Sequence, residues 1–276
     1  MRQANKPILN LFEEHFGFTQ TPFTKNTHPP MVLDGQQEMK ARFLLATREQ
    51  GIALATGQRG CGKSTTLRQF GDELDPNRYL VLDIPNPASG LTGVYRDLVR
   101  KMGYDPSFFK PHLVSQLREA LAQQANRQRQ VVILCDEADC FNDSWLEDMR
   151  MLLSDKLDST SLATLILVGN TTLSARLRLV SHEALWGRIN FRYQLKPLDL
   201  RQTAEYIHHH VKVAGYRGDA LFSDGFIAKA QEYTHGILRR INQLCSYSLV
   251  AAKVRGAKVI DEAIFLQAQR DLDEDL

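Results

Sequence analysis

The stretch GQRGCGKS at residues 57–64 decides the fold, because it is a complete GxxxxGK[ST] phosphate-binding loop. It follows the apolar run 52–55 and precedes a helix-forming segment at 65–74. Glycines allow backbone N–H groups to turn toward a phosphate, and the N-terminus of the following helix attracts the same anion. A plain glycine-rich turn would not need this strand and helix around it. The stretch therefore predicts a nucleotide site.

The last two residues of the loop have expected roles. Lys63 is expected to reach the β- and γ-phosphates of ATP, and the hydroxyl of Ser64 is expected to hold Mg²⁺. The thiol of Cys61 lies inside the loop, where a bulky adduct would block the nucleotide. The residues expected to contact ATP are Gly57, Gly60, Cys61, Gly62, Lys63, Ser64, Thr65 and Asp136.

Two carboxylates, Asp136 and Glu137, follow the apolar run 131–135. The run predicts a buried parallel strand, and ligands bind at the C-terminal edge of such sheets. We expect Asp136 to hold Mg²⁺, directly or through water, and Glu137 to deprotonate the water that attacks the γ-phosphate. The alternative is an acidic strand end that caps the next helix. A small-molecule kinase would activate a hydroxyl instead of water, so Glu137 favours hydrolysis.

Three further polar residues complete the expected site. Asn170 follows the apolar run 165–168, so its amide is expected at the same sheet edge, beside the attacking water. Arg188 precedes the last predicted strand, where a guanidinium can meet the γ-phosphate of a neighbouring protomer. Arg239 begins a helix near the C-terminus and is expected to fold over the nucleotide. A strand-ending turn for Asn170, and ordinary surface charges for the two arginines, are the alternatives.

Composition limits the classes of protein that this chain can be. It has 276 residues, of which 43% are hydrophobic, and 34 Lys and Arg against 32 Asp and Glu give a net charge of +2. No global positive field therefore indicates nucleic-acid binding, and any DNA contact must come from local patches. Neither an apolar run of about 18–20 residues nor a signal peptide is present, so we expect a cytoplasmic protein with no membrane partner.

Cysteine and histidine spacing indicates no metal centre. Cysteines 61, 135, 140 and 245 fit no zinc pattern and are interpreted as packing residues. The triplet 208–210 is all histidine, but neighbouring helical side chains point about 100° apart. A solvated helix face is therefore expected there.

Short apolar runs alternate with helical patterns over the first two thirds of the chain, which predicts a parallel five-stranded sheet between helices, followed by a small all-helical domain. The expected strands are 52–56, 79–84, 131–135, 162–168 and 190–195. The expected helices are 36–48, 63–74, 91–102, 112–127, 143–155 and 172–181, then 200–214, 223–233, 237–255 and 260–271. The expected domains are an N-terminal segment (1–33), a nucleotide-binding α/β domain (34–197) and a helical lid with a short acidic tail (198–276).

Together these residues resemble the AAA+ P-loop ATPases over about residues 10–270. Within them the chain is similar to the ExeA/GspA-like group, on two motifs. Residues 16–23 (FGFTQTPF) match that group's FGF…PF opening, and residues 236–245 (GILRRINQLC) match its G-x-P-R-R-x-N-x-L-C lid motif, with Leu238 in place of proline. The resemblance implies that Lys63 and Ser64 are Walker A, Asp136 and Glu137 Walker B, Asn170 sensor 1, Arg188 the arginine finger and Arg239 sensor 2. Arg176, Arg178, Arg192 and Arg240 lie close to the two arginines.

The same resemblance implies two classes of function. Secretion-type members carry a membrane span, whereas transposition-type relatives (TniB, TnsC, MuB and IstB) are compact and bind DNA. The chain ends without a span, which favours an ATP-dependent regulator of transposition. Its expected partners are double-stranded DNA, a transposase and copies of itself in a hexameric ring or helical filament. The alternatives are a secretion-associated or signalling ATPase acting on protein, a replication initiator or helicase loader, and a scaffold that barely hydrolyses ATP.

DNA contacts have only weak signals in the sequence. A ring or filament repeats a few basic side chains many times, so modest contacts from each subunit add up to strong, salt-dependent binding. The candidates are Arg100, Lys101, Lys110, Arg127 and Arg129, and for each of them a solvated surface charge is the alternative.

Overall fold

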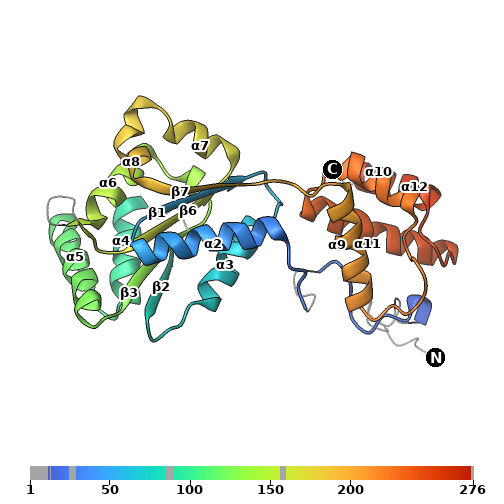
Figure 1. Cartoon of the computed structure of the whole chain (residues 1–276), viewed down its shortest axis with the longest axis horizontal. Coiled ribbons are helices and arrows are strands. Elements are labelled where there is room, and N and C mark those ends of the chain that lie inside the picture. Colours follow the sequence, from blue (N-terminus) through green and yellow to red (C-terminus); the bar gives the residue numbers. More distant parts are fainter. Residues whose placement is uncertain (1–11, 13, 25–28, 85–89, 156–159, 275–276) are drawn as a thin grey trace. The chain divides into compact units, whose positions relative to one another are not determined.

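The computed structural model describes residues 12, 14–24, 29–84, 90–155 and 160–274. It divides into two compact units (Figure 1). The α/β unit spans Asp34–Lys196, and the helical unit combines the described residues up to Leu33 with those from Pro197 onward. The described residues before position 34, which were expected to form a separate N-terminal segment, therefore belong to the helical unit.

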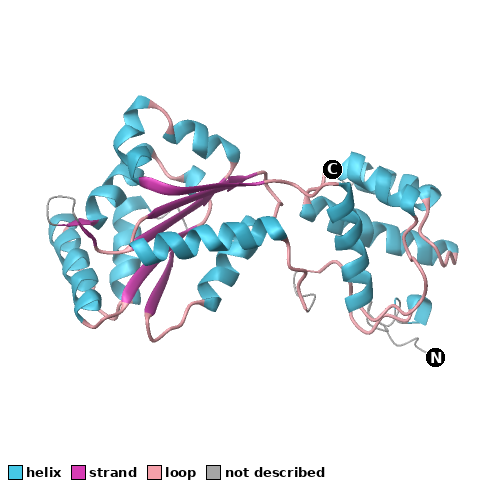
Figure 2. Cartoon of the chain, in the orientation of Figure 1, coloured by secondary structure: helices cyan, strands magenta, loops and turns pink. Residues whose placement is uncertain are grey.

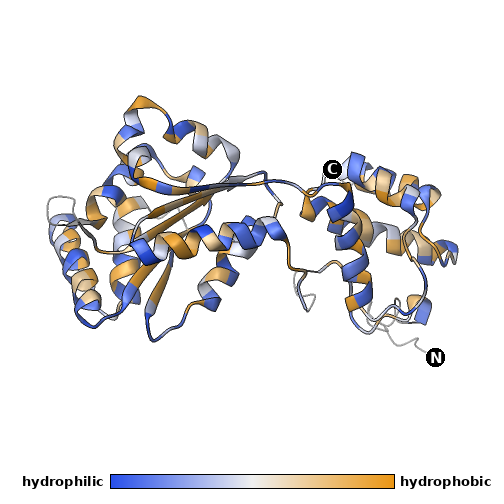
Figure 3. Cartoon of the chain, viewed as in Figure 1, coloured by the Kyte–Doolittle hydropathy of each residue, from blue (hydrophilic) through white to orange (hydrophobic). Residues whose placement is uncertain are grey.

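A parallel five-stranded sheet forms the centre of the α/β unit, in the order β2-β3-β6-β1-β7 (Figure 2). The predicted fold class is confirmed. The inner strands β1, β3 and β6 are buried on both faces between helical layers, which explains their continuous apolar runs (Figure 3). The strands are β1 (Ile52–Gly57), β2 (Tyr79–Ile84), β3 (Gln130–Cys135), β6 (Thr164–Gly169) and β7 (Ile189–Leu195).

Helices cover both faces of this sheet. Two of them, α2 (Asp34–Glu49) and α3 (Lys63–Glu73), contact the central strands β1 and β6. Five others contribute to the main core on the opposite face, together with side chains such as Ile133 and Leu165. They are α4 (Gly90–Lys101), α5 (Lys110–Asn126), α6 (Asp143–Leu153), α7 (Thr171–Leu177) and α8 (Glu183–Arg188).

The region after β6 differs from the prediction. Instead of one helix over 172–181, α7 ends at Leu177, a 3₁₀ turn spans Val180–His182, and the unpredicted α8 follows. Leu177 and His182 are both buried. Residues five apart lie about 140° apart around a straight helix, so a single helix would expose one of them. The helix predicted over 143–155 likewise ends early, where a short antiparallel pair, β4 (Ser154–Asp155) and β5 (Thr160–Ser161), begins.

The helical unit has its own core. Its helices are α9 (Leu200–Val213), α10 (Asp224–Thr234), α11 (Leu238–Arg255) and α12 (Glu262–Glu274). Side-chain caps fix two of their starts: Asp199 forms a capping box with Gln202, and Ser223 caps α10. The aromatic side chains of the FGF…PF motif belong to the same core: Phe16, Phe18 and Phe23 are all buried in it.

Two expectations about histidine and cysteine are wrong in part. His208 is exposed, but His210 is buried and accepts a hydrogen bond at Nδ1 from the backbone N–H of Phe23, because the N-terminal segment packs on α9. Cys140 is exposed, whereas the other three cysteines are buried packing residues. Within the described residues no group of three or more side chains is arranged to hold a metal ion. None of the described helices has the length and hydropathy needed to cross a bilayer.

Candidate nucleotide site

The phosphate loop has the backbone that its glycines predict. Gly60 and Gly62 have φ angles of 88° and 96°, in the left-handed region that glycine occupies without steric cost. Gly62 is also the N-cap of α3 and has no side-chain cap, so backbone N–H groups are presented at the helix start. Ser64 and Thr65 lie in the first turn of α3, both exposed. The loop is therefore shaped to receive an anion.

Lys63 lies at the centre of the loop. Its side chain is buried, and its Nζ donates to the carbonyl oxygens of Gly57 and Gln58, each at 2.9 Å. The neighbouring Cys61 is 3% exposed. Burial raises the pKa of its thiol, and the charge of Lys63 opposes this shift. Cys61 therefore packs inside the loop, and the ammonium of Lys63 is its fixed positive charge.

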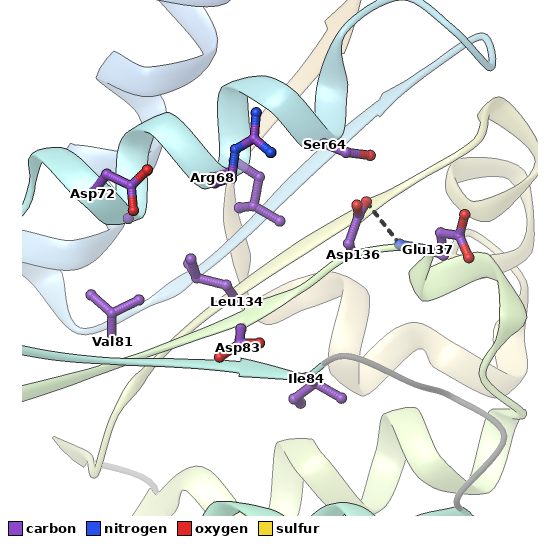
Figure 4. Close-up of a pocket in the computed structure, with 11 residues that line it drawn as sticks. Ser64, Arg68, Asp72, Val81, Asp83, Ile84, Leu134, Asp136 and Glu137 are labelled. Atoms are coloured by element: carbon purple, nitrogen blue, oxygen red, sulfur yellow. Dashed lines mark hydrogen bonds between the residues drawn. The ribbon is translucent and has the colours of Figure 1, made fainter. Parts of the chain in front are cut away.

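The two carboxylates stand at the end of β3. The Asp136 carboxylate accepts a hydrogen bond of 2.9 Å from the backbone N–H of Glu137, which itself has a left-handed φ of 50°. This sharp turn separates the two side chains: Asp136 lies beneath the Ser64 hydroxyl, while Glu137 points away along the sheet edge (Figure 4). Hydroxyl and carboxylate oxygens are the ligands that Mg²⁺ prefers. Ser64 and Asp136 therefore fit a magnesium ion.

A cavity of about 460 Å³ adjoins these residues, between α3 and the strands β2 and β3. Ser64, Asp136 and Glu137 line one end of it (Figure 4). Arg68 and Asp72, one and two turns further along α3, line the remainder. Loop, carboxylates and cavity thus meet at the C-terminal edge of the sheet, where open α/β folds bind ligands.

Asn170 lies on the strand next to the carboxylates, at the end of β6. Its Oδ1 caps α7 by accepting the backbone N–H groups of Thr172 and Leu173, at 2.9 and 3.3 Å. Its own backbone N–H and its Nδ2 both donate to the carboxylate of Asp139, at 2.9 and 2.7 Å. Asp139 is not among the residues that the sequence predicted for the site, although its position three residues after Asp136 places it at the same end of β3.

The arginines near the end of the α/β unit have different surroundings. Arg188, the last residue of α8, is half-buried, and burial followed by the charge of Arg150 lowers its pKa. Arg192 stacks at 3.8 Å on the ring of Trp186. Arg176 donates to backbone carbonyls. Arg176 is thereby removed as an alternative arginine finger, and the role of Arg188 stays a prediction.

Arg239 is an exposed residue in the first turn of α11, in the helical unit. Its proposed role over the nucleotide stays a prediction. The role of Arg239 is therefore not tested by the structure.

The DNA contacts also stay a prediction, but the five candidate side chains differ in their surroundings. Lys101 forms ion pairs with Asp83 and Asp97 at 3.0 and 3.2 Å, and Lys110 pairs with Asp148 at 3.5 Å. The exposed candidates outside these ion pairs are Arg100 and Arg127; Arg129 is half-buried.

Comparison with known proteins finds an AAA domain in this chain. A family model described as an AAA domain matches residues 46–177. General secretion pathway protein A of Aeromonas hydrophila is 28% identical over 268 residues, which cover 94% of this chain and 48% of that protein. The chain thus spans about half the length of this relative.

Solved structures show the same fold. The Orc1 protein of Aeropyrum pernix in complex with DNA has a TM-score of 0.64 and 14% identity, covering 92% of this chain and 69% of that one. The Orc2 protein of the same organism, solved as ADPNP-ADP complexes, has a TM-score of 0.65 and 15% identity. The match covers 89% of this chain and 70% of that one. At such identities the likeness concerns the fold. The chain has the P-loop AAA+ fold, and the prediction of an ATPase is confirmed.

Proposed function

We propose that this AAA+ ATPase is a cytoplasmic regulator of DNA transposition, which assembles with copies of itself on duplex DNA when ATP is bound, recruits a transposase and disassembles after hydrolysis. The observation that carries the proposal is that Glu137 and Asn170 follow the neighbouring strands β3 and β6, at the sheet edge where the phosphate loop begins. Such a site would distinguish ATP from ADP, because both side chains are proposed to act at the phosphate that is lost.

The residues of the site have separate tasks in hydrolysis. Lys63 and the backbone N–H groups of the loop hold the phosphates, and Ser64 and Asp136 hold Mg²⁺, which supplies positive charge against the developing phosphate charge. Glu137 accepts a proton from the attacking water, and the amide of Asn170 orients that water. The turn after β3 holds the Asp136 carboxylate in place, and the cap of α7 holds the Asn170 amide.

Assembly is proposed to complete the site. Arg188, from α8 of one protomer, would meet the γ-phosphate bound by its neighbour, so that ATP binding stabilises a homo-oligomer, as a hexameric ring or a helical filament. Arg239 would contact the nucleotide of its own protomer. Loss of the γ-phosphate removes both contacts, so hydrolysis weakens the assembly.

DNA binding is supported by side chains between β2 and β3. Phe108 and Phe109 are 78% and 66% exposed, and the guanidinium of Arg96 lies 5.6 Å from the Phe108 ring. Arg100 is exposed on the preceding helix α4. Arginines contact phosphate, and a repeated assembly multiplies each such contact. The likeness in fold to Orc1, solved in complex with DNA, supports the same proposal.

The test is to mix the purified protein with duplex DNA and either ATP or a non-hydrolysable analogue, image the particles, and measure phosphate release. We expect nucleotide-dependent rings or filaments on DNA, and turnover that changes with DNA. Arg100→Ala should lower the slope of log affinity against log salt by about one, and Arg217→Ala, an exposed arginine of the helical unit, is the matched control. No assembly, together with turnover indifferent to DNA, would contradict the proposal.

A second candidate, a secretion-associated or signalling ATPase acting on a protein partner, is favoured by the identity to General secretion pathway protein A across 94% of the chain. The same measurements separate the two. This second function predicts turnover that DNA does not alter and that a protein partner does.

A further inference from the structure

We infer that Asp139, Arg176 and His182 are positioning residues, which form a chain of polar contacts from Asn170 to the start of α8, the helix that ends at Arg188, and thereby couple a protomer's own nucleotide to the site of its neighbour. The inference rests on the roles of Asn170 and Arg188 in the proposed function. All the contacts that carry it lie inside the α/β unit.

The first link fixes Asn170. Because Asp139 accepts both its backbone N–H and its side-chain Nδ2, while Oδ1 caps α7, the amide cannot rotate without losing several hydrogen bonds. The preceding Gly169 permits this close approach, since a Cβ there would lie 2.8 Å from Oδ1 of Asp139. Asn170 and Asp139 therefore move together.

The second link is Arg176, in the last turn of α7. Its guanidinium donates to the carbonyl oxygens of Asp139 and Phe141, at 3.1 and 2.7 Å. Its Nε lies 3.3 Å from the carboxylate of Asp143, at the start of α6. Three contacts from one rigid, planar group join the turn after β3 to α6 and α7.

The third link is His182, which is 1% exposed. Its Nε2 lies 3.0 Å from Oδ1 of Asp143, and its Nδ1 lies 3.8 Å from Oε1 of Glu147. Neither nitrogen makes a hydrogen bond of good geometry with the described residues. A buried polar ring held this loosely calls for an explanation. The explanation we infer is that His182, which lies between the carboxylates of Asp143 and Glu147 and immediately before α8, links α6 to α8.

The chain of contacts reaches α8, whose last residue is Arg188. Glu147 pairs with Arg150 at 2.8 Å, and the charges of both residues act on the Arg188 guanidinium. A displacement of Asn170 when the γ-phosphate is lost would therefore pass through Asp139, Arg176 and Asp143 to His182 and α8. Arg188 would then withdraw from the neighbouring site.

Double-mutant cycles on ATP turnover test the chain, since positioning residues lose their effect once the residue they position is gone. We expect Asp139→Asn and His182→Gln each to lower kcat about tenfold with KM unchanged. Asp139→Asn should have no further effect on turnover in an Asn170→Ala background, and His182→Gln should have none in an Arg188→Ala background.

Two additions keep the test decisive. His210→Gln, which removes a buried imidazole from the helical unit, is the control for lost packing and should leave kcat unchanged. Glu147→Gln, at a partly exposed position, replaces His182→Gln if that variant does not fold, with the same expected cycle.

The outcomes distinguish the inference from the proposed function. Effects that multiply independently in the double variants would overturn the inference, as would an equal loss of kcat in His210→Gln. Normal turnover in Asp139→Asn and His182→Gln, with turnover lowered in Asn170→Ala and Arg188→Ala, would also overturn the inference while leaving the proposed site intact. Normal turnover in Asn170→Ala and Arg188→Ala would instead contradict the proposed site itself.

Discussion

Gly57 and Leu195 are register partners on strands β1 and β7, and a Cβ on Gly57 would lie 2.6 Å from the carbonyl oxygen of Leu195. Gly57→Ala would therefore push apart two backbones at the start of the phosphate loop. We expect it to lower the free energy of unfolding by about 1–3 kcal/mol, as overpacking does. The measurement is chemical denaturation of the purified variant.

Gly51, at the opposite end of β1, supplies the matched control. A Cβ there would meet the Ala46 carbonyl oxygen at 4.0 Å, an ordinary contact. Gly51→Ala should leave stability nearly unchanged. Equal losses in the two variants would show that the β1–β7 approach is not the cause.

Glu137→Gln should separate binding from hydrolysis. The amide cannot accept the proton of the attacking water, so turnover should fall by about 10²–10⁴-fold, whereas the phosphate loop is untouched. We expect ATP to raise the melting temperature of this variant as it does for the natural protein.

Lys63→Ala is the companion variant, because it removes the positive charge inside the loop. It should lose the stabilisation by ATP altogether. Glu137→Gln with normal turnover would exclude Glu137 as the base.

The stability of the protein should fall as the pH is lowered from 6.5 to 4, because of His210. Burial, and secondarily the charge of His209, lowers the pKa of His210 to about 4. The unfolded imidazole takes up a proton near its ordinary pKa of about 6.5, whereas the folded one remains neutral until about pH 4. The unfolded state therefore binds more protons across this window. The loss is up to about 3 kcal/mol, measured by denaturation at a series of pH values.

The structural reason lies in the neutral ring. Its Nδ1 accepts the backbone N–H of Phe23 at 3.3 Å, and the ring stacks on that of Phe23. A protonated Nδ1 cannot accept. His210→Gln should therefore have a lower free energy of unfolding at neutral pH, but that free energy should fall less between pH 6.5 and 4 than in the natural protein. An unchanged pH dependence in this variant would show that groups other than His210 cause the loss of stability.

Alkylation should discriminate among the four cysteines. Cys140 is exposed, while Cys61, Cys135 and Cys245 are buried, and burial raises the pKa of each of these three thiols. Because the thiolate is the reactive form, iodoacetamide at pH 8 should modify Cys140 first in the folded protein and all four in denaturant. Peptide mapping by mass spectrometry measures this, and rapid modification of Cys61 would show that the loop opens.

The sequence predicted the sheet well. All five strands begin and end within two residues of their predicted bounds, and the inner strands β1, β3 and β6 leave the clearest local signal because apolar residues fill both of their faces. Helix ends were less accurate after β6, because the break at Leu177 follows from burial on opposite sides of the chain and not from local propensity.

The sequence by itself determined the phosphate loop, the paired carboxylates and the AAA+ fold. Glycine positions, strand ends and a helix start are local properties, and the GQRGCGKS stretch contains the loop completely. Only the tertiary structure decided that Asp139 holds Asn170, that Arg176 is bound elsewhere, and that His182 and His210 are buried. Those contacts join residues that are 31 to 187 positions apart, so packing and not sequence spacing brings them together.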